Sequence, residues 1–116
     1  SGILRTGIHD YAALLGIDFN MTKEERIRYR ESIPTHAMVF MGVDLAGDTP
    51  VKWRVENSWG GERGDKGYLV MYDDWFDEYL YAALVHAKHV PDDVKAIFGG
   101  EPIVLPPWDP MYDGLR

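Results

Sequence analysis

The sequence predicts an α+β fold in which helices come first, a small antiparallel sheet follows and an extended tail ends the chain. Apolar residues recur at helical spacing within residues 1–34, whereas residues 35–90 contain short β-branched and aromatic runs separated by turn formers. Residues 91–116 contain one short helical stretch and then a proline-rich end. A chain of 116 residues has the length of a single domain, so we expect one domain built from these three segments.

Two helices are predicted in the amino-terminal segment. Residues 11–15 carry apolar side chains at helical spacing, and Gly16 follows at the position of a left-handed C-terminal cap. A second helix is predicted to begin after Thr22, because Glu25 three residues later completes a capping-box pattern. Good helix formers continue this helix until Pro34, which cannot propagate it.

The sheet is predicted from runs of strand-forming residues. Residues 36–43 and 51–57 are two such runs, and the turn formers between them at 44–50 predict a hairpin. A glycine-rich loop leads to a third strand at 67–72, and an ambiguous apolar run at about 80–88 is assigned to a fourth. We therefore expect a small antiparallel sheet.

Shorter elements are predicted around and after the sheet. Asp73 or Asp74 is expected to cap a short helix that runs through residues 75–79. A further helical turn is expected from residues 91–93 up to the Gly-Gly pair at 99–100. The end of the chain, EPIVLPPWDPMYDGLR, has four prolines and is predicted to lack regular structure.

Composition excludes several classes of function. The formal net charge of −7 argues against a nucleic-acid surface, which needs clustered Lys and Arg. No apolar run approaches the roughly 20 residues that cross a bilayer, so no membrane span is expected. The absence of cysteine rules out disulfides and thiolate metal sites, and it fits a cytoplasmic location. His86 and His89 have no third ligand at motif spacing, so neither a metal nor a cofactor is predicted.

One pair of polar residues can carry chemistry. His36 stands at the start of the first predicted strand, and Asn57 stands at the end of the next, antiparallel strand. Such neighbours can meet at one end of the sheet, where an amide oxygen can orient an imidazole that acts as a general base. Ser58 and Trp59 are assigned supporting roles, and the indole could cover the bond between the pair. On spacing alone, a satisfied histidine and a turn-forming asparagine remain the alternative.

Four stretches of the sequence are similar to a known family. THAMVFMGVD, KWRVENSWG, KGYLVMYDDWF and PIVLPPWDPM resemble the carboxy-terminal part of the bleomycin hydrolase and aminopeptidase C family of papain-like cysteine peptidases. The resemblance extends from about Tyr11 to Met111 and implies the sheet-bearing lobe of a papain-like fold. It also implies that His36 is the catalytic histidine and Asn57 its orienting amide, in a site completed by a cysteine nucleophile.

The chain departs from this pattern because it has no cysteine. In papain-like enzymes the cysteine lies about 130 to 150 residues from the histidine, and only 35 residues precede His36. We therefore expect a carboxy-terminal segment of a longer intracellular cysteine aminopeptidase. We also expect that the chain alone is inactive, because a missing amino-terminal lobe carries the cysteine.

The tail has a second implied role. In the resembling family the carboxy terminus enters the active-site cleft and restricts cleavage to the amino end of peptide substrates. Trp108, Asp109, Pro110 and Met111 match the stiff lead-in to this terminus, and Arg116 would carry the terminal carboxylate. The YDGLR ending differs from the small apolar ending expected from the family, so an altered terminus remains the alternative.

The resemblance also implies partners. We expect peptide substrates and a homo-oligomer, with the family's hexamer as the expected assembly. One alternative is a stand-alone binding or assembly module that has lost the nucleophile. Another is complementation by a separate chain that supplies the cysteine lobe. The presence of both His36 and Asn57 favours the enzyme, because a binding module does not need this pair.

Overall fold

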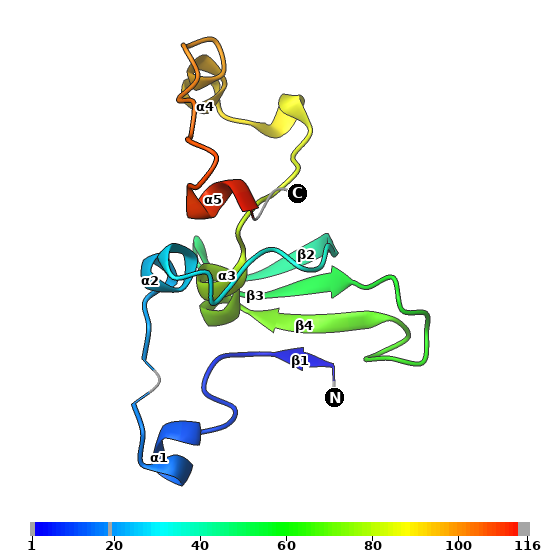
Figure 1. The fold of residues 1–116 in the computed structure, drawn as a ribbon. Helices are drawn as coiled ribbons and strands as arrows, with labels where there is room; N and C mark the ends of the chain where they lie inside the picture. The colour runs from blue at the N-terminus through cyan, green and yellow to red at the C-terminus, as the bar shows by residue number, and fades with distance from the viewer. Residues whose placement is uncertain (1, 19, 114–116) are drawn as a thin grey trace. The chain divides into compact units, whose positions relative to one another are not determined.

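The computed structural model describes residues 2–18 and 20–113 and confirms the α+β fold (Figure 1). Contacts divide the chain into two compact units. The first contains Ser1–Lys23 and Thr35–Leu80, and the second contains Glu24–Pro34 and Tyr81–Arg116. The expectation that the chain forms one domain stays a prediction. The helices and strands, in chain order, are β1 (Ile3–Leu4), α1 (Tyr11–Leu15), α2 (Lys23–Arg28), β2 (Val39–Ala46), β3 (Thr49–Glu56), β4 (Tyr68–Tyr72), α3 (Asp73–Tyr79), the 3-10 helix η1 (Ala87–His89), α4 (Asp92–Ile97) and α5 (Pro110–Asp113).

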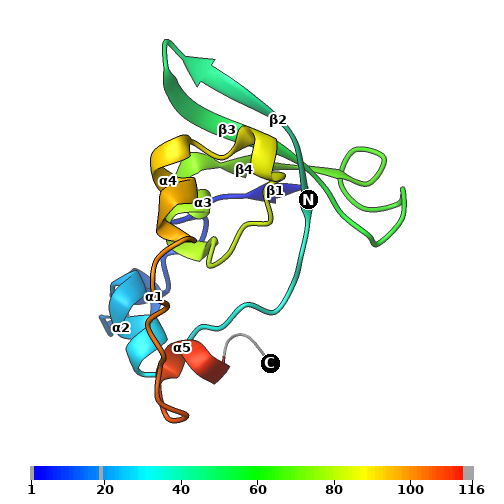
Figure 2. The same cartoon turned by 90° about the horizontal axis from the view of Figure 1, so that it is seen from above.

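The sheet of the first unit has four strands in the order β1-β4-β3-β2 (Figure 1). The predicted hairpin is confirmed as β2 and β3, which pair in antiparallel fashion, and β4 pairs with the other edge of β3. The hairpin extends beyond the rest of the sheet at its turn (Figure 2). β1 was not predicted, and it pairs parallel to β4, with Ile3 opposite Val70. The sheet is therefore mixed rather than purely antiparallel.

The core of the first unit is small. Val55, Leu69 and Met71 are buried, and they lie on the sheet face that α3 covers. Phe76 of α3 stacks on Trp53 of β3, with ring centroids 4.8 Å apart. The Trp53 indole N–H donates a 2.8 Å hydrogen bond to the Asp73 carboxylate. These contacts fix α3 on the sheet directly after β4 ends.

We expect Val55→Ala to lower the free energy of unfolding by about 2 kcal/mol, because it removes two buried methyl groups and leaves a cavity. Val51→Ala is the matched control: it makes the same change in the same strand, but Val51 is 40% exposed whereas Val55 is 0% exposed. The control should cost less than half as much. Urea unfolding followed by circular dichroism measures both, and equal losses would show that Val55 is not the centre of the core.

Two predictions in the first unit need correction. The amino-terminal segment is not purely helical, because β1 precedes α1. Asp73 and Asp74 do not cap α3; its N-cap is Tyr72, with no side-chain hydrogen bond. Both carboxylates are used elsewhere, since Asp73 accepts from the Trp53 indole and Asp74 accepts a 2.7 Å hydrogen bond from the Thr6 hydroxyl. By contrast, Gly16 adopts the predicted left-handed C-cap of α1, with φ of 66°.

The predicted fourth strand at 80–88 is wrong. Residues 80–86 have no regular structure, and η1 follows at Ala87–His89. Leu84 in this run is fully exposed. Strand propensity depends on cross-strand packing, and this run pairs with no strand. Among the described residues, no helix is long and apolar enough to cross a membrane.

The second unit contains short helices joined by irregular segments. α2 begins after Thr22 as predicted but ends at Arg28, well before Pro34, and Arg30 then adopts a positive φ of 61°. α4 confirms the helical turn predicted after Pro91. The tail is not wholly irregular, because α5 forms at Pro110–Asp113. The Asp109 carboxylate accepts a 2.9 Å hydrogen bond from the Met111 N–H, and proline is well suited to the first helical position.

Candidate active site

His36 and Asn57 meet at the end of the β2–β3 hairpin opposite its turn. His36 lies just before β2, Asn57 directly follows β3, and the register pairs Val39 with Glu56 at this end. The antiparallel pairing therefore brings the two flanking residues together. His36 Nε2 and Asn57 Oδ1 are 2.9 Å apart, a hydrogen-bond distance.

Backbone groups hold Asn57 in place. Its N–H donates a 3.0 Å hydrogen bond to the Gly67 carbonyl, across the loop between β3 and β4. The Ser58 N–H donates a 2.8 Å hydrogen bond to the Asn57 side-chain oxygen. The Asn57 side chain is 7% exposed, so it is buried within this frame. Ser58 thus supports the pair through its backbone, and the structure gives its hydroxyl no role.

The Ser58 bond determines which way the Asn57 amide points. A backbone N–H can only donate, so the side-chain atom that it contacts must be the carbonyl oxygen. The same oxygen faces His36 Nε2, which must therefore carry the hydrogen. In the neutral imidazole, Nδ1 then holds the free lone pair. The arrangement presents Nδ1 as the atom that can take a proton.

Trp59 covers one face of the imidazole. The two rings stack with centroids 4.8 Å apart and an interplanar angle of 27°. The indole is itself 58% exposed, so it lies between His36 and solvent. An aromatic ring in this position limits the access of water that would compete for the hydrogen bond between His36 and Asn57.

The glycines of the loop at residues 57–67 allow the chain to turn sharply between β3 and β4. Gly60, Gly64 and Gly67 have φ values of 77°, 64° and 91°, a region that L side chains rarely adopt. Gly67 is buried, and a Cβ there would come within 3.2 Å of the Gly60 carbonyl oxygen. A glycine at 67 therefore lets its carbonyl reach the Asn57 N–H. The glycine spacing predicted a sharp turn but not this bond.

The predicted tail residues belong to the second unit, and His36 and Asn57 belong to the first. Trp108 is 76% exposed, and its carbonyl accepts a 3.1 Å hydrogen bond from Arg30. Pro110 and Met111 begin α5, and Asp109 precedes it, with its carboxylate accepting from the Met111 N–H. Arg116 lies outside the described residues. The substrate-limiting role of the tail stays a prediction.

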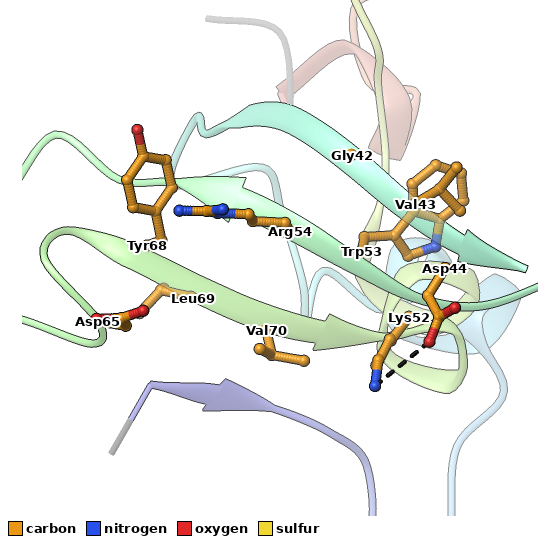
Figure 3. A pocket seen from close by; sticks show the side chains of 10 residues that line it. All are labelled: Gly42, Val43, Asp44, Lys52, Trp53, Arg54, Asp65, Tyr68, Leu69 and Val70. Atoms are coloured by element: carbon orange, nitrogen blue, oxygen red, sulfur yellow. Dashed lines mark ion pairs between the residues drawn. The ribbon is translucent and has the colours of Figure 1, made fainter.

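A pocket on the sheet lies apart from the candidate site (Figure 3). Its wall includes Arg54, whose guanidinium lies 4.0 Å from the centroid of the Tyr68 ring. Lys52 and Asp44 form an ion pair of 3.3 Å on its other side. Neither His36 nor Asn57 lines this pocket. No group of three or more potential metal ligands occurs in the part of the chain that the structure describes.

An antiparallel hairpin that brings a histidine and an asparagine together, with a helix packed on its sheet, matches the sheet-bearing lobe expected of a papain-like peptidase. The model of the peptidase C1-like family matches residues 1–112, so the chain belongs to this family. It is 50% identical over 114 residues to bleomycin hydrolase of Mus musculus, covering 95% of this chain and 25% of that protein. It is 47% identical over 114 residues to aminopeptidase C of Lactobacillus delbrueckii subsp. lactis, covering 96% and 25%.

The solved structure of PepW from Lactobacillus rhamnosis HN001 is also similar, with a TM-score of 0.81 and 49% identity. The similarity covers 95% of this chain and 25% of PepW. The chain therefore spans about a quarter of the length of these relatives. These 116 residues include no cysteine.

Proposed function

We propose that His36 and Asn57 are the general base and its orienting amide in a cysteine peptidase whose thiol lies outside these 116 residues. The observation that carries this proposal is the shared oxygen of Asn57, which accepts from both the Ser58 N–H and His36 Nε2. This shared oxygen fixes the tautomer of His36 and leaves Nδ1 free to act on the thiol.

The proposed reaction follows from this geometry. Nδ1 of His36 takes the proton of the thiol, and the thiolate attacks the peptide carbonyl carbon. The imidazolium keeps its Nε2–H on the Asn57 oxygen while Nδ1–H protonates the leaving amine, and the C–N bond breaks. A water molecule then attacks the thioester, Nδ1 accepts its proton and returns it to the sulfur, and the acid product leaves. Asn57 holds the ring in one orientation through both half-reactions.

The names of the relatives indicate the substrate. Aminopeptidase C acts at the amino end of peptides by its name, so we infer an aminopeptidase activity for the enzyme to which this chain contributes. The tail at Trp108–Met111 is proposed to restrict cleavage to the amino end. Hexameric assembly and a cytoplasmic location stay predictions.

A fusion enzyme tests the proposal. The last quarter of the Lactobacillus delbrueckii aminopeptidase C is replaced by this chain, which aligns with it over 114 residues. We expect the fusion to hydrolyse an aminoacyl 4-nitroanilide, whereas neither the truncated relative nor this chain alone should do so. The isolated chain lacks the cysteine nucleophile, so its rate should equal that of buffer.

Two results would contradict the proposal. One is a folded, cysteine-containing fusion without activity, which would favour a binding module. The other is hydrolysis by the isolated chain that is lost on His36→Ala, because that would require a nucleophile within these 116 residues. Circular dichroism and titration of the fusion's thiol establish that the protein is folded and reduced before either result is interpreted.

A further inference from the structure

Arg63 lies on the indole that covers His36. The carbon at the centre of its guanidinium is 5.8 Å from the centroid of the Trp59 ring, and that ring stacks on the imidazole of His36. Within the described part of the chain, the Arg63 side chain has no carboxylate partner at ion-pair distance. The contact that the structure gives its guanidinium is with the indole.

The loop that anchors Asn57 also anchors the backbone of Arg63. The Gly67 N–H donates a 2.9 Å hydrogen bond to the Arg63 carbonyl. The Gly67 carbonyl in turn accepts the 3.0 Å hydrogen bond from the Asn57 N–H. Two backbone hydrogen bonds, both made by Gly67, therefore connect the backbone of Arg63 to the backbone of Asn57. The Arg63 side chain therefore extends from a backbone position that hydrogen bonds fix relative to Asn57.

Because the Trp59 indole is exposed, specific contacts must hold it over the imidazole of His36. Trp59 is 58% exposed, and within the described residues its ring and cation contacts are with His36 and Arg63 alone. Stacking on a neutral imidazole restrains the ring from one side only. A guanidinium near the indole adds a cation–π attraction, to which tryptophan contributes more than the other aromatic residues.

We propose that Arg63 is a positioning residue that holds the Trp59 ring over His36 and so protects the hydrogen bond between His36 Nε2–H and Asn57 Oδ1 from water. This inference rests on the proposed function, because it assigns Arg63 a role in the same site. Arg63 contacts neither a reacting atom nor the substrate in this role. It acts through Trp59, and its effect is on the fraction of time that the bond is covered.

Nuclear magnetic resonance of the ¹⁵N-labelled chain tests the inference. The readouts are the solvent exchange rate of His36 Nε2–H and the ring-current shift that Trp59 imposes on the His36 ring protons. Arg63→Gln should raise the exchange rate about two- to fivefold, the range expected for the loss of an exposed cation–π contact, and should reduce the ring-current shift. Arg63→Lys keeps the positive charge but lacks the planar guanidinium. Its exchange rate and ring-current shift should therefore lie between those of the wild-type chain and those of Arg63→Gln.

The matched control is Arg54→Gln. Arg54 also lies over an aromatic ring, at 4.0 Å from the Tyr68 centroid, but it lines the separate pocket rather than the site (Figure 3). Arg54→Gln removes the same charge from the same unit, and this variant should leave both His36 readouts unchanged. An equal effect of the two variants would assign the change to net charge and would overturn the positioning role.

The remaining outcomes separate this inference from the proposed function. If the wild-type chain carries its imidazole hydrogen on Nδ1, the tautomer is wrong and the proposed function fails. If Nε2–H is present but does not respond to Arg63→Gln, the proposed function stands and the role of Arg63 fails. If Arg63→Gln also shifts the Asn57 and Gly67 backbone amides, the side chain holds the loop rather than the ring, and the inference is again overturned.

Discussion

His36→Ala in the fusion enzyme is expected to lower kcat/KM by about 100- to 10,000-fold, the range that a positioned general acid–base contributes. The loss should fall mainly on kcat, because the imidazole transfers protons during the reaction and is not needed to bind the peptide. Steady-state kinetics with an aminoacyl 4-nitroanilide, at a concentration of fusion enzyme set by thiol titration, measures the change.

The control for this variant is His9→Ala. His9 belongs to the same unit, and its ring lies 5.7 Å from that of Tyr11 rather than near Asn57. Its replacement should leave kcat/KM within about twofold of the unmodified fusion, as expected for a surface change away from the site. Asn57→Ala should give an intermediate loss, since the base remains but its tautomer and orientation are no longer fixed. Equal activity of His36→Ala and the unmodified fusion would exclude the catalytic role.

The placement of His36 and Asn57 could be predicted because it depends on local structure. Two strands joined by a short turn must be antiparallel, so the residue before the first and the residue after the second lie at one end of the sheet. The turn is marked by Gly47 and Asp48, and pairing starts beside it with Ala46 opposite Thr49. Two irregularities in the register follow, between Asp44 and Leu45 and between Phe40 and Gly42, and they do not change which end of the hairpin carries His36 and Asn57. No contact between distant parts of the chain was needed for this step.

Elements that depend on distant contacts could not be predicted in this way. β1 is a strand of two residues, and it exists because it pairs with β4, more than 60 residues later. Residues 80–88 show the opposite case, since their composition favours a strand but no strand is paired with them. Strand formation requires a partner that propensity cannot identify.

The supporting contacts of the site were predicted only in part. Trp59 was expected to cover the pair because it lies two residues after Asn57, and it stacks on His36. The contribution of Ser58 comes from its backbone N–H, which every residue except proline has, so no side-chain pattern could reveal it. No sequence motif indicated a role for Arg63. The role proposed for Arg63 follows only from the folded loop at residues 57–67, which places its guanidinium near the indole.

Gly64 lies in the loop that anchors Asn57 and packs closely against Gly2, the residue before β1. It has a φ of 64°, and a Cβ at this position would overlap the Tyr68 carbonyl oxygen and lie 2.7 Å from the Leu69 side chain. Gly2 is close on the other side, because a Cβ at Gly2 would be 2.8 Å from the Gly64 Cα. The Gly2 carbonyl accepts a 2.8 Å hydrogen bond from the Val70 N–H, which holds β1 against β4.

Gly64→Ala is therefore expected to destabilise the first unit by about 2–5 kcal/mol, as the sum of a left-handed conformation at about 1–2 kcal/mol and overpacking at about 1–3 kcal/mol. Gly47→Ala separates the two contributions, because Gly47 has nearly the same φ, 65°, but a Cβ there would meet nothing within 4 Å. The control should cost only the conformational part. Urea unfolding gives both free energies, and hydrogen exchange of the Val70 amide reports whether β1 has detached. If the two variants are equally stable, the close approach of Gly64 to the backbone adds nothing to the stability of the first unit, and backbone hydrogen bonds such as that from Asn57 to Gly67 hold the loop without it.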